Sequence, residues 1–451
     1  MLHTGGARSN VRQIRQRIAR SIPLKKPTTI GNSTSSRSFW KRLGPGIITG
    51  AADDDPSGVA TYSQVGAGFG YSILWTAFFT FPLMVGIQVV SARIGRVSGD
   101  GLAANIRKHY SPWVLYAIVG LLLVANTINI AADIGAMGAA LRLLIGGPAH
   151  LYAVGFGVIS VVLQVFIPFP RYSPILKVLT LALLAYVVTV FVVHVPWSEV
   201  GYRTIWPSIS FESTYVVAVV AVFGTTISPY LFFWQASQEV EEQRAAKGQE
   251  PLRRAPQQAA AELRRIRNDT YFGMGVSNVV AFFIMLTAIV TLRMHGITEI
   301  HTSAEAAQAL RPVAGDFAFA LFAAGIIGTG LLAVPVLAGS AAYAMAEAFK
   351  WRIGLGRPLM RAKGFYTIIV IATLLGVALN FTAIDPIKAL FWSAVINGVI
   401  AVPIMVIMML LAVKPQVMGS FVVTRRLRIL GWLATIVMAL SVVAMLLTWR
   451  N

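Results

Sequence analysis

An acidic segment containing proline interrupts the first long apolar stretch of the chain. Residues 53–58 read Asp-Asp-Asp-Pro-Ser-Gly, and mainly apolar residues flank them over 43–52 and 59–69. A carboxylate at bilayer depth costs roughly 3 kcal/mol or more unless it is paired, and proline with glycine breaks a helix. An interrupted, acidic segment in a membrane-spanning stretch is typical of a cation-binding site.

A second break lies in the sixth apolar stretch, where residues 224–230 read Gly-Thr-Thr-Ile-Ser-Pro-Tyr. Pro229 has no N–H, so the Thr225 carbonyl loses its helical partner, and Pro56 does the same to the Ala52 carbonyl. A bare carbonyl at membrane depth must face a cavity, a polar neighbour or an ion. A single break is better explained by an ordinary proline kink, but two at matching positions, one beside a carboxylate, favour a binding site.

Composition restricts the class of protein that carries these breaks. Of the 451 residues, 56% are hydrophobic and 12% are charged, and the mean hydropathy is +0.69, which is typical of a polytopic membrane protein. The net charge of +20 comes from basic residues between the apolar stretches. Such residues hold loops on the cytoplasmic side of a membrane and contact anionic lipid headgroups, which explains the charge better than nucleic-acid binding does. The chain has no cysteine and no metalloprotease, nucleophile-elbow or Walker motif, so we expect no enzyme activity.

The apolar stretches predict an all-α fold with about eleven transmembrane helices. Their expected ranges are 44–68, 71–94, 113–145, 150–169, 174–196, 214–237, 271–294, 314–348, 364–380, 386–413 and 430–449. The two breaks fall in spans one and six. This spacing is expected if spans one to five and six to ten are inverted repeats around a central site.

Basic segments alternate with the predicted spans and therefore all fall on one side of the membrane. They are the N-terminal tail and residues 93–108, 171–177, 244–267, 350–363 and 414–428. The positive-inside rule then places the N-terminus in the cytoplasm and the C-terminus outside. We expect residues 1–42 to form a disordered basic tail. Within the loop at 238–270, residues 259–267 predict either a short amphipathic helix or a solvated linker.

Four stretches resemble the natural resistance-associated macrophage protein (Nramp) family of divalent-metal transporters. They read GPGIITGAADDDPSG, NTINIAADIGAMGAAL, TTISPYLFFWQ and DPIKALFWSAVINGV. The resemblance implies a LeuT-type fold with discontinuous helices 1 and 6 and alternating access. It also implies a transporter core at 43–413, inverted repeats at about 43–196 and 214–413, and an additional helix at 430–449.

The resemblance implies a metal site with three departures from the family pattern. The expected site residues are Asp55, Ala52, Thr225, Ser228, Gly58 and Asn397. The family motif Asp-Pro-Gly-Asn is Asp55-Pro56-Ser57-Gly58 here, so glycine replaces an asparagine ligand. The family motif Met-Pro-His is Ser228-Pro229-Tyr230 here. In span ten, Ala394 replaces a glutamine, and Asn397 lies one turn further along.

These departures predict a preference for Mg²⁺, with Mn²⁺ accepted. Replacing a thioether by a hydroxyl removes a soft ligand, and oxygen ligands suit hard cations. Mg²⁺ keeps several waters and binds through one or two carboxylates, so a roomier site anchored by Asp55 suits it. The pattern is similar to the Nramp-related magnesium transporters.

Proton coupling is expected to be weak or absent. Relatives have an aspartate and a glutamate on span three with the sixth-span histidine, whereas this chain has Asp133, Ala136 and Tyr230. A tyrosine titrates near pH 10 unperturbed and is a poor relay at neutral pH. Asp133, Tyr230 and Asp54 remain candidates for a proton route or vestibule. Asn126, Asn129 and Asp133 share one helix face, where polar contacts between helices explain them as well as transport does.

Two other functions remain open at this stage. One is a proton-coupled Mn²⁺/Fe²⁺ transporter of ordinary Nramp type, and the other is an ion-coupled amino-acid transporter on the same fold. Three aspartates at the first break argue against binding a substrate carboxylate there. We expect a monomer in the bacterial cytoplasmic membrane that needs no cofactor, its partners being the bilayer and the transported Mg²⁺ or Mn²⁺.

Overall fold

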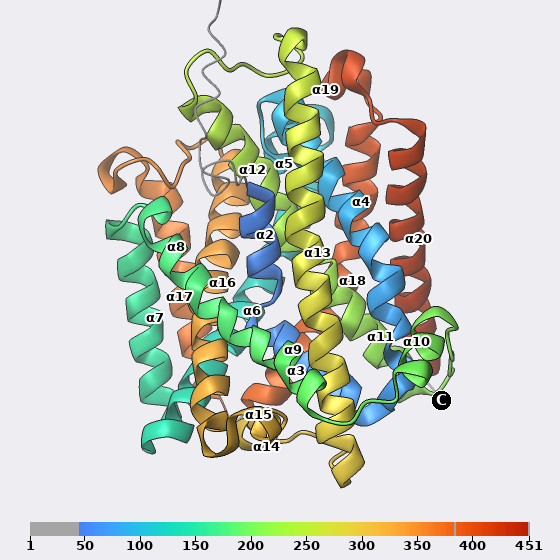
Figure 1. Cartoon of the computed structure of the whole chain (residues 1–451). Helices are drawn as coiled ribbons and strands as arrows, with labels where there is room; N and C mark the ends of the chain where they lie inside the picture. The colour runs from blue at the N-terminus through green and yellow to red at the C-terminus, as the bar shows by residue number, and fades with distance from the viewer. Residues whose placement is uncertain (1–44, 383–384, 450–451) are drawn as a thin grey trace, which may run out of the picture. The chain divides into compact units, whose positions relative to one another are not determined.

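The computed structural model describes residues 45–382 and 385–449, so the tail predicted for 1–42 lies outside the described residues. This part of the chain is all-helical and has no strand (Figure 1). Nine helical stretches in it are long and apolar enough to cross a membrane. The shorter α17 (Lys363–Leu379) and the broken first span account for the other two predicted spans. The prediction of an all-α membrane protein is confirmed.

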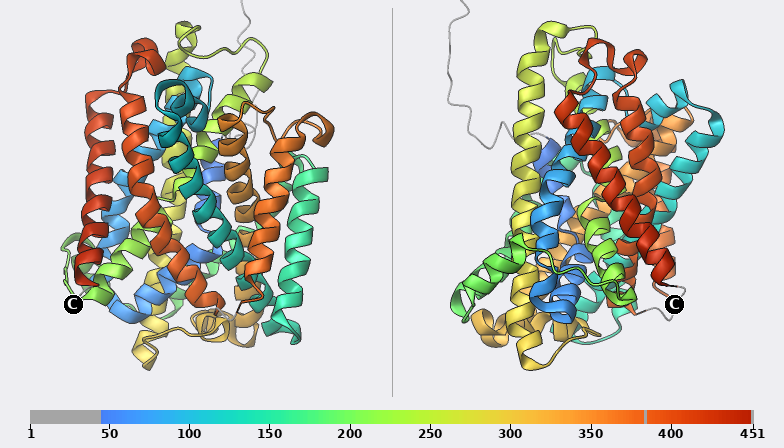
Figure 2. Two further views of the ribbon diagram at one scale, coloured as in Figure 1. Left: turned by 180° about the vertical axis from the view of Figure 1, so that it is seen from behind. Right: turned by 90° about the vertical axis from the view of Figure 1, so that its right-hand side faces the viewer.

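The longer helices follow the predicted spans in order. The first repeat contains α4 (Trp75–Ser98), α6 (Pro112–Ile145), α7 (Ala149–Phe166), α8 (Phe169–Thr180) and α9 (Leu184–Val192). The second contains α13 (Ala259–Thr291), α16 (Ala318–Ala348), α17 and α18 (Pro386–Ala412). An additional helix, α20 (Arg425–Thr448), follows α18 and packs beside it and α4 (Figure 2).

Both predicted breaks are present, and each divides one span into two helices. The first span consists of α2 (Pro45–Asp53) and α3 (Pro56–Phe69), and the sixth consists of α11 (Ser213–Thr226) and α12 (Pro229–Ala245). In each case the proline occupies the first turn of the second half-helix, where its missing N–H is tolerated. The prediction of discontinuous helices 1 and 6 is therefore confirmed.

Glycines let the broken spans approach their neighbours backbone to backbone. A Cβ added at Gly50 of α2 would lie 2.3 Å from the Gly273 carbonyl of α13, and one added at Gly273 would lie 2.3 Å from the Gly46 carbonyl. On the other repeat, a Cβ at Gly224 of α11 would lie 2.0 Å from the Ala394 carbonyl of α18. Any side chain at these positions would push the first half of each broken span away from its support.

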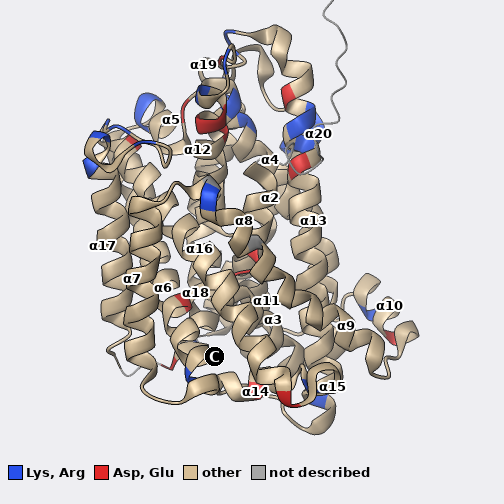
Figure 3. Ribbon diagram, turned by 60° about the vertical axis from the view of Figure 1, so that its left-hand side comes forward, with Lys and Arg blue, Asp and Glu red and all other residues tan. Residues whose placement is uncertain are grey.

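The outer helices carry exposed apolar side chains at helical spacing. Val158, Ile159 and Val162 are exposed on α7, and Leu440 and Val443 on α20. Water would disfavour such faces, whereas acyl chains match them. Charged residues are mostly absent from these outer apolar faces (Figure 3). Most Lys and Arg lie at the end of the bundle that carries the loops around α5 (Leu102–His109).

The sequence predicts a short amphipathic helix or a solvated linker for residues 259–267, and both predictions are wrong. These residues are neither a separate amphipathic helix nor a linker, because α13 runs without interruption from Ala259 to Thr291. The segment has no proline or glycine after Pro256 until Gly273, and a Glu262–Arg265 ion pair supports its first turns. Span seven therefore extends well beyond its apolar portion.

We predict that Gly273→Ala destabilises the protein by about 1–3 kcal/mol, because the added methyl overpacks the contact between α2 and α13. Thermal unfolding in detergent would measure the effect. Gly275→Ala is the matched control on the same helix, since its added Cβ would have no neighbour closer than 3.6 Å. Equal melting temperatures for the two variants would contradict the role assigned to this contact.

Candidate functional site

The two breaks meet inside the bundle. The Tyr230 hydroxyl, at the start of α12, donates a hydrogen bond to the Ala52 carbonyl at the end of α2, at 2.9 Å. A Cβ added at Gly58 of α3 would lie 3.3 Å from Thr225 Oγ1. The first and sixth spans are thus joined at the residues that the prolines affect, and all four of these residues are buried.

Asp55 is the N-cap of α3 and still keeps one oxygen for another partner. Its Oδ1 accepts hydrogen bonds from the Gly58 N–H at 2.7 Å and from the Ser57 hydroxyl at 2.8 Å. Its Oδ2 lies 3.4 Å from the Tyr230 hydroxyl, which is a long contact. Capping and cation binding are therefore compatible, because they use different oxygens of one carboxylate that is 1% exposed.

The carbonyls freed by proline are held by hydroxyl groups. Ala52 accepts the Tyr230 hydroxyl, and Thr225 accepts the Ser228 hydroxyl at 2.7 Å. Ser228 also lies 3.0 Å from the Gly224 carbonyl, and it makes no side-chain cap on α12. Each carbonyl oxygen has two lone pairs, so a single hydroxyl leaves acceptor capacity at both breaks.

The ends of the half-helices add a favourable field for a cation. Both α2 and α11 end at a break, so the negative ends of their dipoles point toward the junction. The opposing positive end of α3 is covered by the Asp55 carboxylate that caps it. The positive end of α12 has no side-chain cap, but the two negative helix ends and the Asp55 carboxylate outweigh it, so the field at the junction favours positive charge.

Two further candidate residues lie on helices that pack against the broken spans. Asp133 on α6 interacts electrostatically with Asp55, yet neither of its oxygens accepts a hydrogen bond of normal geometry from the described residues. Asn397 on α18 is 1% exposed, and both of its amide atoms are unpaired. Asn397 lies beside Gly398, which packs against Gly224. Asn397 belongs to the expected metal site, and Asp133 to the candidates for a proton route or vestibule.

Asp54 and its neighbour Asp53 point to another helix. The Ser277 hydroxyl of α13 lies 2.6 Å from an Asp53 oxygen and 3.0 Å from an Asp54 oxygen. Asp54 and Ser277 also line a cavity of about 120 Å³ between α2, α9 and α13. Sequence reasoning missed Ser277, although a hydroxyl within the apolar part of span seven was a visible signal.

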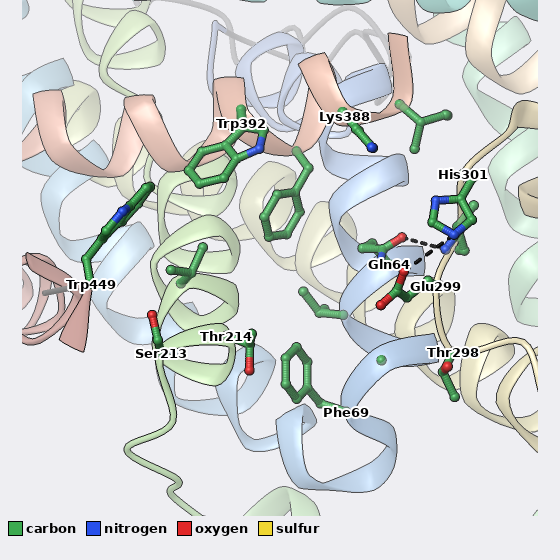
Figure 4. A pocket seen from close by; sticks show the side chains of 16 residues that line it. Gln64, Phe69, Ser213, Thr214, Thr298, Glu299, His301, Lys388, Trp392 and Trp449 are labelled. Carbon is green, nitrogen blue, oxygen red and sulfur yellow. Dashed lines mark hydrogen bonds and ion pairs between the residues drawn. The ribbon is translucent and has the colours of Figure 1, made fainter. Parts of the chain in front are cut away.

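A wide vestibule lies beyond the junction at the end of the bundle opposite the basic loops. Its volume is about 760 Å³, and it lies between α3, α11, α18 and the end of α20. Trp392 and Trp449 line one side, while Gln64, Glu299 and His301 lie together on the other (Figure 4). There the Gln64 side-chain oxygen Oε1 accepts a hydrogen bond from the Ile300 N–H at 3.0 Å.

Ion pairs tie the helices together at the end where the basic loops lie. Arg265 of α13 contacts Glu239 at 2.5 Å and Glu242 at 3.2 Å, both on α12. Arg96 of α4 is fully buried and contacts Glu262 at 3.3 Å. This network joins helices α4, α12 and α13 at the basic end. A cavity of about 370 Å³ also lies at this end, lined in part by Ser98, Lys108 and Arg253.

The donor set at the junction differs from a cluster of acidic or imidazole ligands. Among residues 45–382 and 385–449, no group of three His, Cys, Asp or Glu side chains is arranged to hold a metal ion. A cation at the junction would instead meet one free carboxylate oxygen of Asp55, backbone carbonyls, hydroxyls and the Asn397 amide. These are hard oxygen donors.

Comparisons with known proteins agree with this architecture. The chain is 26% identical over 423 residues to the divalent metal cation transporter MntH of Klebsiella pneumoniae (strain 342), covering 91% of this chain and 95% of the relative. The crystal structure of an Eremococcus coleocola manganese transporter in complex with an aromatic bis-isothiourea substituted compound superposes with a TM-score of 0.68 at 19% identity. It covers 90% of this chain and 86% of that one.

A more distant structure has the same fold. MhsT in complex with L-phenylalanine superposes with a TM-score of 0.62 at 11% identity, covering 90% of this chain and 98% of that one. The family model described as natural resistance-associated macrophage protein-like (Nramp) matches residues 46–448. With two broken spans meeting at an oxygen-lined junction, this chain belongs to the Nramp family.

Proposed function

We propose that this multi-pass membrane protein is a secondary transporter that takes up divalent cations, preferring Mg²⁺ and accepting Mn²⁺, by alternating access. The observation that carries the proposal is the donor set at the junction of the two breaks. Asp55 supplies the anionic oxygen, Ala52 and Thr225 supply carbonyls, and Ser228 stands where the family has methionine.

Ligand chemistry supports the choice of metal. Carboxylate, carbonyl and hydroxyl oxygens suit Mg²⁺ and Mn²⁺, whereas thioether sulfur selects softer metals. Gly58 leaves space where an asparagine ligand would stand, and Mg²⁺ uses such space because it retains several waters. The similar MntH is named as a divalent metal cation transporter and the similar solved structure as a manganese transporter, which supports a divalent cation as the cargo.

The contrast between the two ends of the bundle supports alternating access. A vestibule of about 760 Å³ opens at one end of the bundle, and the Arg96–Glu262–Arg265 network joins helices at the other. Most Lys and Arg lie at the end of the bundle that carries this ion-pair network (Figure 3). The positive-inside rule places that end in the cytoplasm. The vestibule then faces outside, where a cation would arrive.

Weak or absent proton coupling forms part of the proposal. Ala136 and Tyr230 stand where relatives carry a glutamate and a histidine. The Tyr230 hydroxyl is committed to the Ala52 carbonyl, which gives it a structural role. An inside-negative membrane potential supplies about 2.3 kcal/mol per charge for each 100 mV, which is sufficient to drive accumulation of a dication.

An amino-acid substrate fits the junction poorly. A substrate carboxylate would need half-helix N-termini with free N–H groups. Here Asp55 occupies the N-terminus of α3, and Asp53, Asp54 and Asp133 add negative charge nearby. The similarity to MhsT therefore concerns the fold and gives no support for its ligand.

Replacing Asp55 by asparagine is expected to lower Mg²⁺ and Mn²⁺ uptake into proteoliposomes by at least about tenfold, which is a typical loss for an ion-binding group. Asparagine caps a helix as well as aspartate does, so α3 should remain folded. Asp385→Asn is the matched control, because Asp385 caps α18 ahead of a proline and is exposed. Mg²⁺ and Mn²⁺ uptake by Asp55→Asn at the wild-type rate would contradict the proposal.

Introducing the missing thioether should alter metal selectivity. In Ser228→Met, we expect the ratio of Cd²⁺ to Mg²⁺ uptake to rise several-fold, since sulfur favours the softer ion. Ser228→Ala is the control, because it loses the same hydrogen bonds to Thr225 and Gly224 without adding sulfur. Wild-type protein that carries Cd²⁺ well and Mg²⁺ not at all would refute the Mg²⁺ preference.

Mg²⁺ influx is expected to leave the lumenal pH of proteoliposomes unchanged. A lumenal pH dye would be followed during uptake driven by an inside-negative K⁺ diffusion potential, with the charge of the dication supplying the driving force. Adding a protonophore at the end shows that the dye responds. Stoichiometric acidification of the lumen with Mg²⁺ entry would contradict uncoupled transport.

A further inference from the structure

Three polar side chains lie along one face of α6, and the first of them is held by a neighbouring helix. The Asn126 amide donates to the Leu337 carbonyl at 2.8 Å and to the Ser340 hydroxyl at 2.7 Å, both on α16. This is the contact between helices that explains polar residues in membrane spans. Asn126 therefore has a packing role, and this contact does not explain Asn129 and Asp133.

Asn129 has no such role. It is fully buried, and neither its oxygen nor its nitrogen has a hydrogen-bond partner among the described residues. Leaving a buried polar group unpaired lowers the stability of the fold, so an apolar residue of similar size would be more stable here. Unpaired buried groups of this kind usually bind a water molecule or an ion.

The position of Asn129 on the helix directs it toward the junction. Asn129 precedes Asp133 by four residues and so lies on the same face of α6, one turn away. Asp133 interacts electrostatically with Asp55, and α6 packs against both α3 and α18. Asn397, which is also unpaired, lies on α18 beside the glycine contact with Gly224.

Asn129, Asp133 and Asn397 share one chemical property, which is that all of them offer oxygen acceptors. Asp133 contributes two carboxylate oxygens, and Asn129 and Asn397 each contribute an amide oxygen. A water bound to a cation directs its lone pair at the ion and both hydrogens outward, so the groups around a hydrated cation must accept. The Ala52 and Thr225 carbonyls at the breaks are suited to bind the ion directly. The oxygens of Asn129, Asp133 and Asn397 are suited instead to accept hydrogen bonds from the water molecules bound to the ion.

We propose that Asn129, together with Asp133 and Asn397, holds the water molecules that the divalent cation retains in the site. The inference rests on the proposed function and adds a selectivity determinant to it. Mg²⁺ dehydrates reluctantly, so it depends on partners for its waters more than Mn²⁺ does. Removing the Asn129 amide should therefore affect Mg²⁺ more strongly than Mn²⁺.

The test compares Asn129→Leu with Asn126→Leu, the same substitution one turn earlier on the helix. Asn129→Leu is expected to lower Mg²⁺ uptake into proteoliposomes by about 10–100-fold, the usual loss when an outer partner of a metal is removed, and Mn²⁺ uptake much less. Its melting temperature without metal should equal or exceed that of the wild type, because no protein hydrogen bond is lost. Asn126→Leu should melt at a lower temperature.

Asn129→Asp keeps the size and an acceptor at this position, so it should retain Mg²⁺ uptake even if the leucine variant fails to fold. The inference is overturned if Asn129→Leu carries Mg²⁺ at the wild-type rate, if it lowers Mg²⁺ and Mn²⁺ uptake equally, or if Asn129→Asp loses Mg²⁺ uptake. Mg²⁺ uptake that is absent from the wild-type protein would instead overturn the proposed function itself.

Discussion

The structure depends on how two backbone carbonyls are satisfied at a depth where water is scarce. Proline removes the helical partners of the Ala52 and Thr225 carbonyls, and neither lipid nor an apolar side chain can replace them. Hydroxyl groups replace the lost partners. Tyr230 donates to the Ala52 carbonyl across the junction, and Ser228 donates to the Thr225 carbonyl within its own break. Because the Tyr230 hydrogen bond joins α2 to α12, satisfying one carbonyl also fixes the two broken spans together.

This junction requires backbones that approach each other closely, and glycine provides that approach. Gly46, Gly50 and Gly273 bring α2 against α13, and Gly224 brings α11 against α18. A carbonyl and a hydroxyl can meet between helices only when no Cβ holds the helices apart. The packing of the bundle and the chemistry at its centre are therefore consequences of the same small residues.

The breaks, their proline-directed carbonyls and most spans could be predicted from the sequence, because proline and long apolar runs act locally. The direction of individual side chains could not. Asp53 and Asp54 share their motif with Asp55 yet meet Ser277 on α13, and Asn126 is bonded to α16 whereas Asn129 is not. These differences arise from which helix lies opposite each residue, and that depends on tertiary packing.

An ion at this junction would compete with the hydrogen bonds that hold it together. A cation that takes the Ala52 carbonyl and the free oxygen of Asp55 approaches the two acceptors that face the Tyr230 hydroxyl. Its charge would also balance the repulsion between Asp55 and Asp133, which have no cationic partner near them among the described residues. Binding would thus loosen the link between α2 and α12 while drawing α3 toward α6. Occupancy of the site would then be coupled to the relative position of the half-helices, as the proposed alternating access requires.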